Sequence, residues 1–182
     1  GRERAAKLLD EIPSENILIG VAPGSVWGTK RWLPENFAAV IDAVARERPA
    51  SFVIIGGPQD IEAAASVVQK TAAPVLNLAG KTSISEMIAV LEKLNLFITN
   101  DSGPMHVAAA LDVPIVAIFG ATTPSLGFAP YTPKARIVEP PAKLECRPCS
   151  AHGPKSCPEV HFRCMKDITP EMVIHAARQM GI

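Results

Sequence analysis

The chain has 182 residues, 48% hydrophobic and 20% charged, and its 18 lysines and arginines balance 18 aspartates and glutamates. That length predicts a single domain with a sizeable core, and the neutral balance argues against nucleic acid, which requires clustered basic surface. No apolar run approaches the roughly 20 residues that span a bilayer, and the charged opening at residues 1–4 predicts no signal peptide.

Helices and strands are expected to alternate along the chain. Apolar runs predict strands at residues 17–22, 51–55, 75–78, 94–99, 115–119 and 136–138. Helical spacing and capping signals predict helices at residues 2–11, 34–47, 60–70, 83–93, 104–111 and 169–180. Strands that are apolar throughout are buried on both faces, and their alternation with helices implies right-handed βαβ units. The predicted fold is therefore α/β, a Rossmann-like parallel sheet with helices on both faces.

Residues 139–166 break this alternation, because they are rich in proline and hold all four cysteines: Cys146, Cys149, Cys157 and Cys164. We expect an ordered excursion of the domain 1–182, closed before the last helix. The C-x-x-C spacing of the first pair would suit a structural zinc ion, although the second pair is spaced unlike an ordinary zinc knuckle. Free thiols in a packed loop and a disulfide formed on oxidation remain the alternatives. Such local cysteines favour a reducing, cytoplasmic setting.

The most informative motif, at residues 100–106, directly follows the predicted strand at 94–99. A buried strand, a tight turn and a helix that opens with Pro104 leave backbone N–H groups at the carboxyl edge of the sheet. This arrangement is the usual seat of a phosphate ligand. Ser102 is expected to be the N-cap of the helix, and Gly103 belongs to the turn.

Two further side chains of this turn carry charge or can titrate. Asp101 is expected to take a sugar hydroxyl or backbone N–H groups, because a carboxylate repels a diphosphate. His106 lies one turn into the helix, and we expect it to face the ligand rather than to be a core histidine. Asp101, Ser102 and His106 therefore place three functional side chains in one turn.

Parallel strands bring sequence-distant loops together at their carboxyl ends. The loops rich in polar and glycine residues are 23–32, 56–60, 80–82, 99–106 and 120–128. In the first, Lys30 would supply a point charge to a phosphate, although a solvated surface loop is an equal alternative, and Trp32 is expected to pack. In the second, Gln59 and Asp60 are expected near the ligand, with Asp60 favoured as a helix N-cap.

Three stretches, Pro23–Pro34, Asn100–His106 and Phe119–Pro124, together with the cysteine-rich tail resemble the heptosyltransferases of glycosyltransferase family nine. The resemblance spans nearly the whole chain. It implies the C-terminal half of a two-domain GT-B enzyme, the half that holds the ADP-heptose donor. The N-terminal half, absent here, would bind a lipid-linked saccharide acceptor, the inner core of lipopolysaccharide. For the whole enzyme the resemblance implies peripheral association with the cytoplasmic face of the inner membrane and no membrane span.

The resemblance also implies roles for individual residues. The donor-binding set is Ser25 and Lys30 on the diphosphate, Gln59 or Asp60 near the ribose, Asp101 at the donor sugar and diphosphate, and Ser102, Gly103 and His106 in the turn and helix. The general base, an aspartate, belongs to the absent half, so this fragment is expected to be inactive alone. Family members invert the anomeric carbon while ADP leaves, and we expect no catalytic metal, because a helix N-terminus and Lys30 suit the charge that grows on the β-phosphate.

Two other functions remain open at this point. A nucleotide-sugar epimerase can share the GT-B architecture, but such enzymes depend on several acid–base carboxylates in the cleft, and few are present here. A non-catalytic module that senses ADP would need the same binding loops without any transfer chemistry. The motifs at residues 23–34 and 100–106 favour the transferase.

Overall fold

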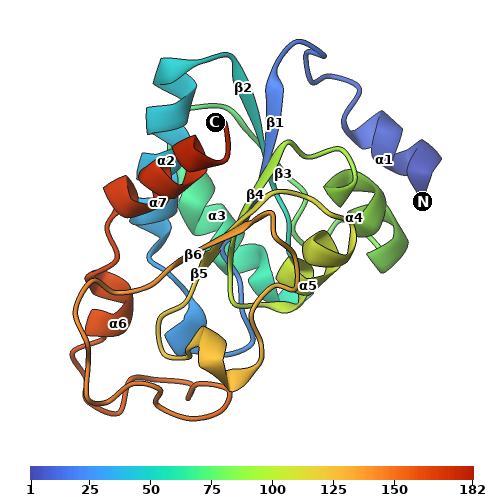
Figure 1. Cartoon of the computed structure of the whole chain (residues 1–182). Coiled ribbons are helices and arrows are strands. Elements are labelled where there is room, and N and C mark those ends of the chain that lie inside the picture. The colour runs from blue at the N-terminus through green and yellow to red at the C-terminus, as the bar shows by residue number, and fades with distance from the viewer.

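The computed structural model describes residues 1–182, and six parallel strands form its central sheet (Figure 1). The strands are β1 (Ile17–Ala22), β2 (Ala50–Ile54), β3 (Val75–Asn77), β4 (Leu96–Asn100), β5 (Ile115–Ile118) and β6 (Ala135–Val138). Their order across the sheet is β3-β2-β1-β4-β5-β6. This is the doubly wound order typical of nucleotide-binding domains, so the predicted α/β class and parallel sheet are confirmed.

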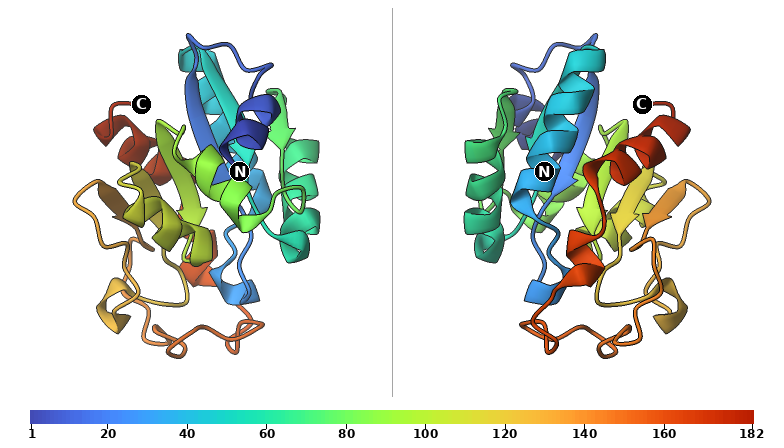
Figure 2. Two further views of the ribbon diagram at one scale, coloured as in Figure 1. Left: turned by 90° about the vertical axis from the view of Figure 1, so that its right-hand side faces the viewer. Right: turned by 90° about the vertical axis from the view of Figure 1, so that its left-hand side faces the viewer.

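Seven helices surround the sheet: α1 (Arg2–Leu8), α2 (Pro34–Glu47), α3 (Ile61–Lys70), α4 (Ile84–Leu91), α5 (Gly103–Ala110), α6 (Arg163–Lys166) and α7 (Pro170–Gln179). Figure 2 shows α1, α4 and α5 on one side of the sheet, with α2 and α7 on the other. Helix α3 packs beside α2. The domain therefore has three layers, and the sheet lies in the middle.

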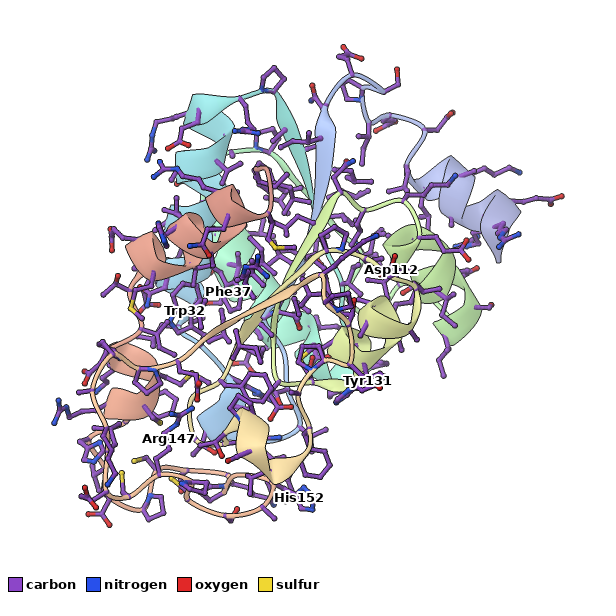
Figure 3. All side chains as sticks on the ribbon, viewed as in Figure 1. Trp32, Phe37, Asp112, Tyr131, Arg147 and His152 are labelled. Carbon is purple, nitrogen blue, oxygen red and sulfur yellow. The ribbon has the colours of Figure 1, made fainter.

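The strand residues alternate between two apolar clusters, one on each face of the sheet. Ile19 and Val21 of β1 pack with α2, α3 and α7, whereas Leu18 packs with α1, α4 and α5. Because helices cover both faces, both sets of strand side chains are buried, which explains why the strands are apolar throughout. Figure 3 labels Trp32 and Phe37 inside this core, and their rings meet edge to face at 5.0 Å.

The direction of chain winding reverses between β1 and β4, and this fixes where a ligand can bind. From β1 the chain crosses to β2 and β3, and from β4 it crosses the other way to β5 and β6. Ala22, the last residue of β1, pairs in register with Thr99 near the end of β4. The loops that leave these two strands must therefore diverge, and the crevice between them is the usual ligand site of such sheets.

The element boundaries differ from the prediction at a few ends. Helix α1 stops at Leu8, and α4 stops at Leu91. Three short 3-10 helices were not predicted: Gly28–Lys30, Pro58–Asp60 and Pro124–Leu126. Single turns of this kind carry no hydrophobic periodicity, so the sequence pattern does not reveal them.

Residues 139–166 form a long irregular segment in which only α6 is helical. It runs below the sheet in Figure 1 and returns to the core at α6, where Cys164 and Met165 are buried. The indole N–H of Trp32 donates to the carbonyl of Ile168 at 3.0 Å, which fixes the start of α7 against α2. No helix of the structure is both long and apolar enough to cross a bilayer.

Candidate functional site

A cleft of about 340 Å³ opens at the carboxyl ends of the strands, at the reversal between β1 and β4. The chain segments that line it follow β1, β2 and β4, with single residues from two later loops. Its polar and charged lining residues are Ser25, Lys30, Gln59, Asp60, Asp101, Ser102, His106 and His152. Gly103 lies on the cleft wall as well, so all eight residues predicted for donor binding line this cleft.

A buried ion pair joins the loop after β1 to the turn after β4. The ammonium of Lys30 lies 2.7 Å from Oδ2 of Asp101, and the two side chains are only 9% and 5% exposed. A lysine reaches this position because the 3-10 helix Gly28–Lys30 turns the chain back toward the sheet edge. An ammonium has three N–H donors, so the bond to Asp101 leaves Lys30 able to bind a further anion in the cleft.

Neighbouring hydroxyls complete the environment of Asp101. Thr122 Oγ1, in the loop after β5, donates to Oδ2 of the carboxylate at 2.7 Å, so this oxygen accepts from both Thr122 and Lys30. Ser25 Oγ donates to the backbone carbonyl of Asp101 at 3.4 Å. In this structure the Asp101 carboxylate bonds to an ammonium and a threonine hydroxyl and to no backbone N–H, and its role at a sugar hydroxyl stays a prediction.

The N-terminus of α5 lies open at the cleft. Ser102 occupies the N-cap position as predicted, but its side chain makes no capping hydrogen bond and lies instead 3.2 Å from Thr99 Oγ1. The positive end of the helix dipole is therefore not satisfied by the cap residue. His106 is exposed and lines the cleft, so it is not a core histidine.

Asn100 ties the two halves of the site together. It is fully buried, its amide nitrogen donates to the carbonyl of Pro23 at 2.8 Å, and its amide oxygen accepts from the backbone N–H of Trp32 at 3.1 Å. The last residue of β4 thus holds both ends of the loop that carries Lys30. Trp32 is 1% exposed, which confirms the packing role predicted for it.

The turn after β2 differs from the predicted helix cap. Asp60 precedes α3, but it makes no side-chain capping bond to that helix. Its Oδ2 accepts from the backbone N–H of Gly57 at 2.9 Å and from Gln59 Nε2 at 3.2 Å, while its buried Oδ1 has no partner. A Cβ placed on Gly24 would lie 2.1 Å from this Oδ1, so Asp60 packs directly against the backbone of the loop after β1.

The loops that the topology was expected to gather contribute unequally. The 80–82 loop gives no residue to the cleft, because β3 is an edge strand that β1 and β2 separate from the reversal. The 120–128 loop contributes Phe128 to the lining, and the excursion contributes His152, whose ring lies 5.5 Å from that of Phe128. His152 and Thr122 were missed. The position of Thr122 just after a buried strand was a usable signal, whereas His152 sits in an irregular segment without one.

The zinc site that the sequence suggested at the four cysteines is not formed. No group of three or more His, Cys, Asp or Glu side chains has the geometry of a metal site, and all four cysteines are free. Cys164 is buried in the core beside Met165, where burial and the neighbouring thiols raise its pKa to about 11. Burial likewise raises the pKa of Cys149. Cys164 belongs to the core, and Cys146 and Cys149 pack against it partly buried.

Comparison with known proteins places this geometry in a family. The sequence profile of glycosyltransferase family 9 (heptosyltransferase) matches residues 2–158, most of the chain. The chain belongs to glycosyltransferase family 9. Lipooligosaccharide heptosyltransferase 2 of Campylobacter jejuni is 36% identical over 168 residues, which cover 90% of this chain and 50% of that protein. This family 9 chain therefore spans about half the length of the curated relatives it matches.

Solved structures agree with the family assignment. The glycosyl transferase family 9 structure from Veillonella parvula superposes with a TM-score of 0.84 at 33% identity, covering 98% of this chain and 50% of the other. The Escherichia coli structure described as ADP-heptose lps heptosyltransferase II gives a TM-score of 0.79 at 25% identity, covering 99% and 51%. In both cases this family 9 chain corresponds to half of the larger protein.

Proposed function

We propose that this chain is the donor-binding domain of a heptosyltransferase that takes ADP-heptose and transfers heptose to the inner core of lipopolysaccharide. The observation that carries the proposal is the Lys30–Asp101 pair beside the open N-terminus of α5, at the sheet reversal of a family 9 chain. The names of the relatives support the donor and the acceptor, and the family match favours transfer over epimerisation.

In this proposal the diphosphate of the donor lies between Lys30 and the α5 N-terminus, which carries Ser102, Gly103 and His106. The departing ADP gains negative charge on its β-phosphate in an inverting displacement, and a cationic side chain and a helix N-terminus stabilise that charge. Ser25 adds a hydroxyl near the same point. The turn that carries Gln59 and Asp60 lies across the cleft wall and would face the ribose.

The acceptor and the general base fall outside this chain in the proposal. Because the chain spans about half of its relatives, we propose that a further domain supplies the base and binds the lipid-linked saccharide at the cytoplasmic face of the membrane. Sites that join two domains commonly close over the ligand between them. The chain alone is then expected to bind the donor but to transfer nothing.

Calorimetric titration with ADP, with UDP as a comparison, tests the binding part of the proposal. Replacing Lys30 with alanine is expected to weaken ADP binding by about 1–3 kcal/mol, the scale of a lost hydrogen bond to a charged group. Lys134→Ala is the matched control, since Lys134 also pairs with an aspartate, Asp112, but is exposed and lies outside the cleft. Equal ADP affinity in the Lys30 variant and the unchanged chain would contradict the proposal.

A second experiment separates the transferase from a non-catalytic ADP-binding module. The full-length protein is incubated with ADP-heptose and a lipid-linked acceptor, and release of ADP is measured with and without the acceptor. Transfer that depends on Asp101 supports the proposal. Tight ADP binding without any turnover in the full-length protein would favour the sensing module instead.

A further inference from the structure

Arg147 lies in the cysteine-rich segment, far in sequence from every residue predicted for the site, yet its side chain is only 12% exposed. Its guanidinium donates to three carbonyls of the loop after β5, those of Phe119, Gly120 and Thr122, two of them at 3.0 and 2.8 Å. The N–H of Cys149 donates to the carbonyl of Ala121 at 3.0 Å. Four consecutive carbonyls, 119–122, are therefore held by residues 147–149.

The chemistry of this contact requires an arginine. A guanidinium presents five N–H donors in a fixed plane, whereas an ammonium is a single point with three. Glu139 accepts at 2.6 Å from the same guanidinium nitrogen, Nη2, that donates to Phe119 and Thr122, and so helps to orient it. The Arg147 side chain, which lies between Cys146 and Cys149, thus makes more hydrogen bonds with the loop after β5 than the thiols of the C-x-x-C pair do.

The clamped loop leads directly to the ion pair of the cleft. Thr122 accepts from Arg147 through its carbonyl and donates through Oγ1 to Asp101 Oδ2. The same Oδ2 holds the ammonium of Lys30. Each link in this series is a hydrogen bond between buried or nearly buried groups, so a displacement of the loop must reach the lysine.

The segment also holds the lysine from its own side. Thr29, the residue before Lys30, donates its hydroxyl to the carbonyl of Pro154 at 2.6 Å. A Cβ on Gly153 would lie 2.9 Å from Thr29 Oγ1, which leaves no room for a side chain at that position. Residues 147–154 therefore contact the loop that carries Lys30 and the loop that carries Thr122, the hydroxyl partner of Asp101.

We propose that Arg147 is a positioning residue for the nucleotide site: it fixes the 119–122 loop so that Thr122 and Asp101 hold the Lys30 ammonium in the cleft. The identity of the bound anion, a nucleoside diphosphate, rests on the proposed function. The position of Lys30 does not, and it can be measured without a ligand. Figure 3 labels Arg147 in the lower part of the molecule, away from α5.

The experiment compares the unchanged chain with Arg147→Lys and with Arg136→Lys. Arg136 lies on β6, is exposed and lines no part of the cleft, so its variant makes the same chemical change elsewhere. Acetylation of Lys30 by limiting acetic anhydride is measured by mass spectrometry, relative to Lys143, which is 87% exposed. We expect Lys30 to react several-fold faster in Arg147→Lys only. ADP affinity should fall roughly 3- to 30-fold in that variant, while affinity for adenosine stays unchanged.

A double-mutant cycle with Thr122→Val tests the route of the effect. If Arg147 acts through Thr122, the double variant loses no more ADP affinity than the more damaging single variant. Fully additive losses would overturn that route. If Arg147→Lys does not fold, Glu139→Gln replaces it, because it weakens the orientation of the guanidinium without unpairing the carbonyls.

The outcomes separate this proposal from the proposed function. Unchanged Lys30 reactivity in a folded Arg147→Lys or Glu139→Gln chain overturns the positioning role. Absence of ADP binding by the unchanged chain overturns the proposed function, and the acetylation result still decides the role of Arg147. Loss of ADP and adenosine binding together would show a general structural effect and would also overturn the proposal.

Discussion

Two parts of the cleft wall are built in different ways: the sheet-edge wall, formed by the turns after β1 and β4, and the irregular segment 139–166. The turns after β1 and β4 carry Lys30 and Asp101 on short connections whose position follows from the order of the strands. The segment 139–166 is almost without regular structure, and individual hydrogen bonds from Arg147 and to Pro154 hold it in place. The sheet edge thus supplies the charged groups of the ion pair, and the irregular segment bonds to the loops that hold them.

This difference has an energetic side. Contacts at the sheet edge are backed by the core on both faces, so they are lost only when the domain unfolds. The contacts of the irregular segment depend on a few polar groups, each worth on the order of 1 kcal/mol. Substitutions on the sheet-edge wall are therefore expected to cost more stability than substitutions in the segment.

The largest effect is expected from Asp101→Ala. This change leaves the Lys30 ammonium buried without its carboxylate, and breaking a buried ion pair typically costs about 3–5 kcal/mol of unfolding free energy. Asp112→Ala is the control, because Asp112 also pairs with a lysine, at 2.6 Å, but its side chain is 63% exposed. A surface pair of that kind contributes below about 1 kcal/mol.

Urea denaturation of the two aspartate variants measures both effects. Equal losses of unfolding free energy would mean that burial does not distinguish the two pairs. The sheet-edge wall would then be no more rigid than the surface, and the contrast between the walls would fail.

Two glycines of the same wall give a finer test. A methyl group on Gly24 would meet Asp60 Oδ1 at 2.1 Å, whereas a methyl group on Gly103 has nothing within 4 Å. Gly24→Ala is therefore expected to cost about 1–3 kcal/mol through overpacking. Gly103→Ala should stay within about 0.5 kcal/mol of the unchanged chain, as for most surface substitutions.

The glycine pair also reports on the ligand. Gly103 lines the cleft, so its methyl group projects into space that a bound diphosphate would need, and ADP affinity should fall although stability does not. Thermal denaturation and ADP titration of the same samples check the two expectations. A Gly103→Ala chain with unchanged stability and unchanged ADP affinity would place the diphosphate elsewhere.

The contrast between the walls also explains which parts of the fold and of the cleft the sequence predicts. At both the strand 17–22 and the motif 100–106, an apolar strand is followed by a turn and a helix that opens with proline, and βαβ handedness leaves one arrangement for them. The parallel order then brings Lys30, Gln59 and Asp101 to one edge. All of this follows from local patterns and topology.

The remaining features depend on contacts that no local pattern encodes. The sequence predicts Asp60 as a helix N-cap, but Asp60 packs against Gly24 and its carboxylate accepts from the N–H of Gly57 instead. The C-x-x-C spacing suggested a role for its thiols, whereas the arginine between them bonds to the loop after β5. In both places the decisive contact is with a residue distant in sequence, Gly24 for Asp60 and the 119–122 carbonyls for Arg147, so neither spacing nor periodicity records the partner.

The smallest effect concerns Cys164, the residue through which the irregular segment rejoins the core. Burial, with smaller contributions from Cys149 and the other thiols, raises its pKa from 9.0 to about 11. The folded chain therefore keeps this proton when the unfolded chain releases it. Its contribution to stability is complete below pH 9 and is lost as the pH rises toward 11, by on the order of 1 kcal/mol at pH 10.

Comparison with Cys164→Ala isolates this titration from those of lysines and the tyrosine. The variant is less stable at neutral pH, because it leaves a small cavity, but its unfolding free energy should fall less steeply between pH 9 and about 10.5. The thiol should also resist iodoacetamide at pH 8, since alkylation needs the thiolate and an open path to it. Parallel pH profiles for the two proteins would mean that Cys164 is accessible to water in the folded chain. The segment would then be loosely attached at the very point where it meets the core, and the loops that it bonds to would lack that anchor.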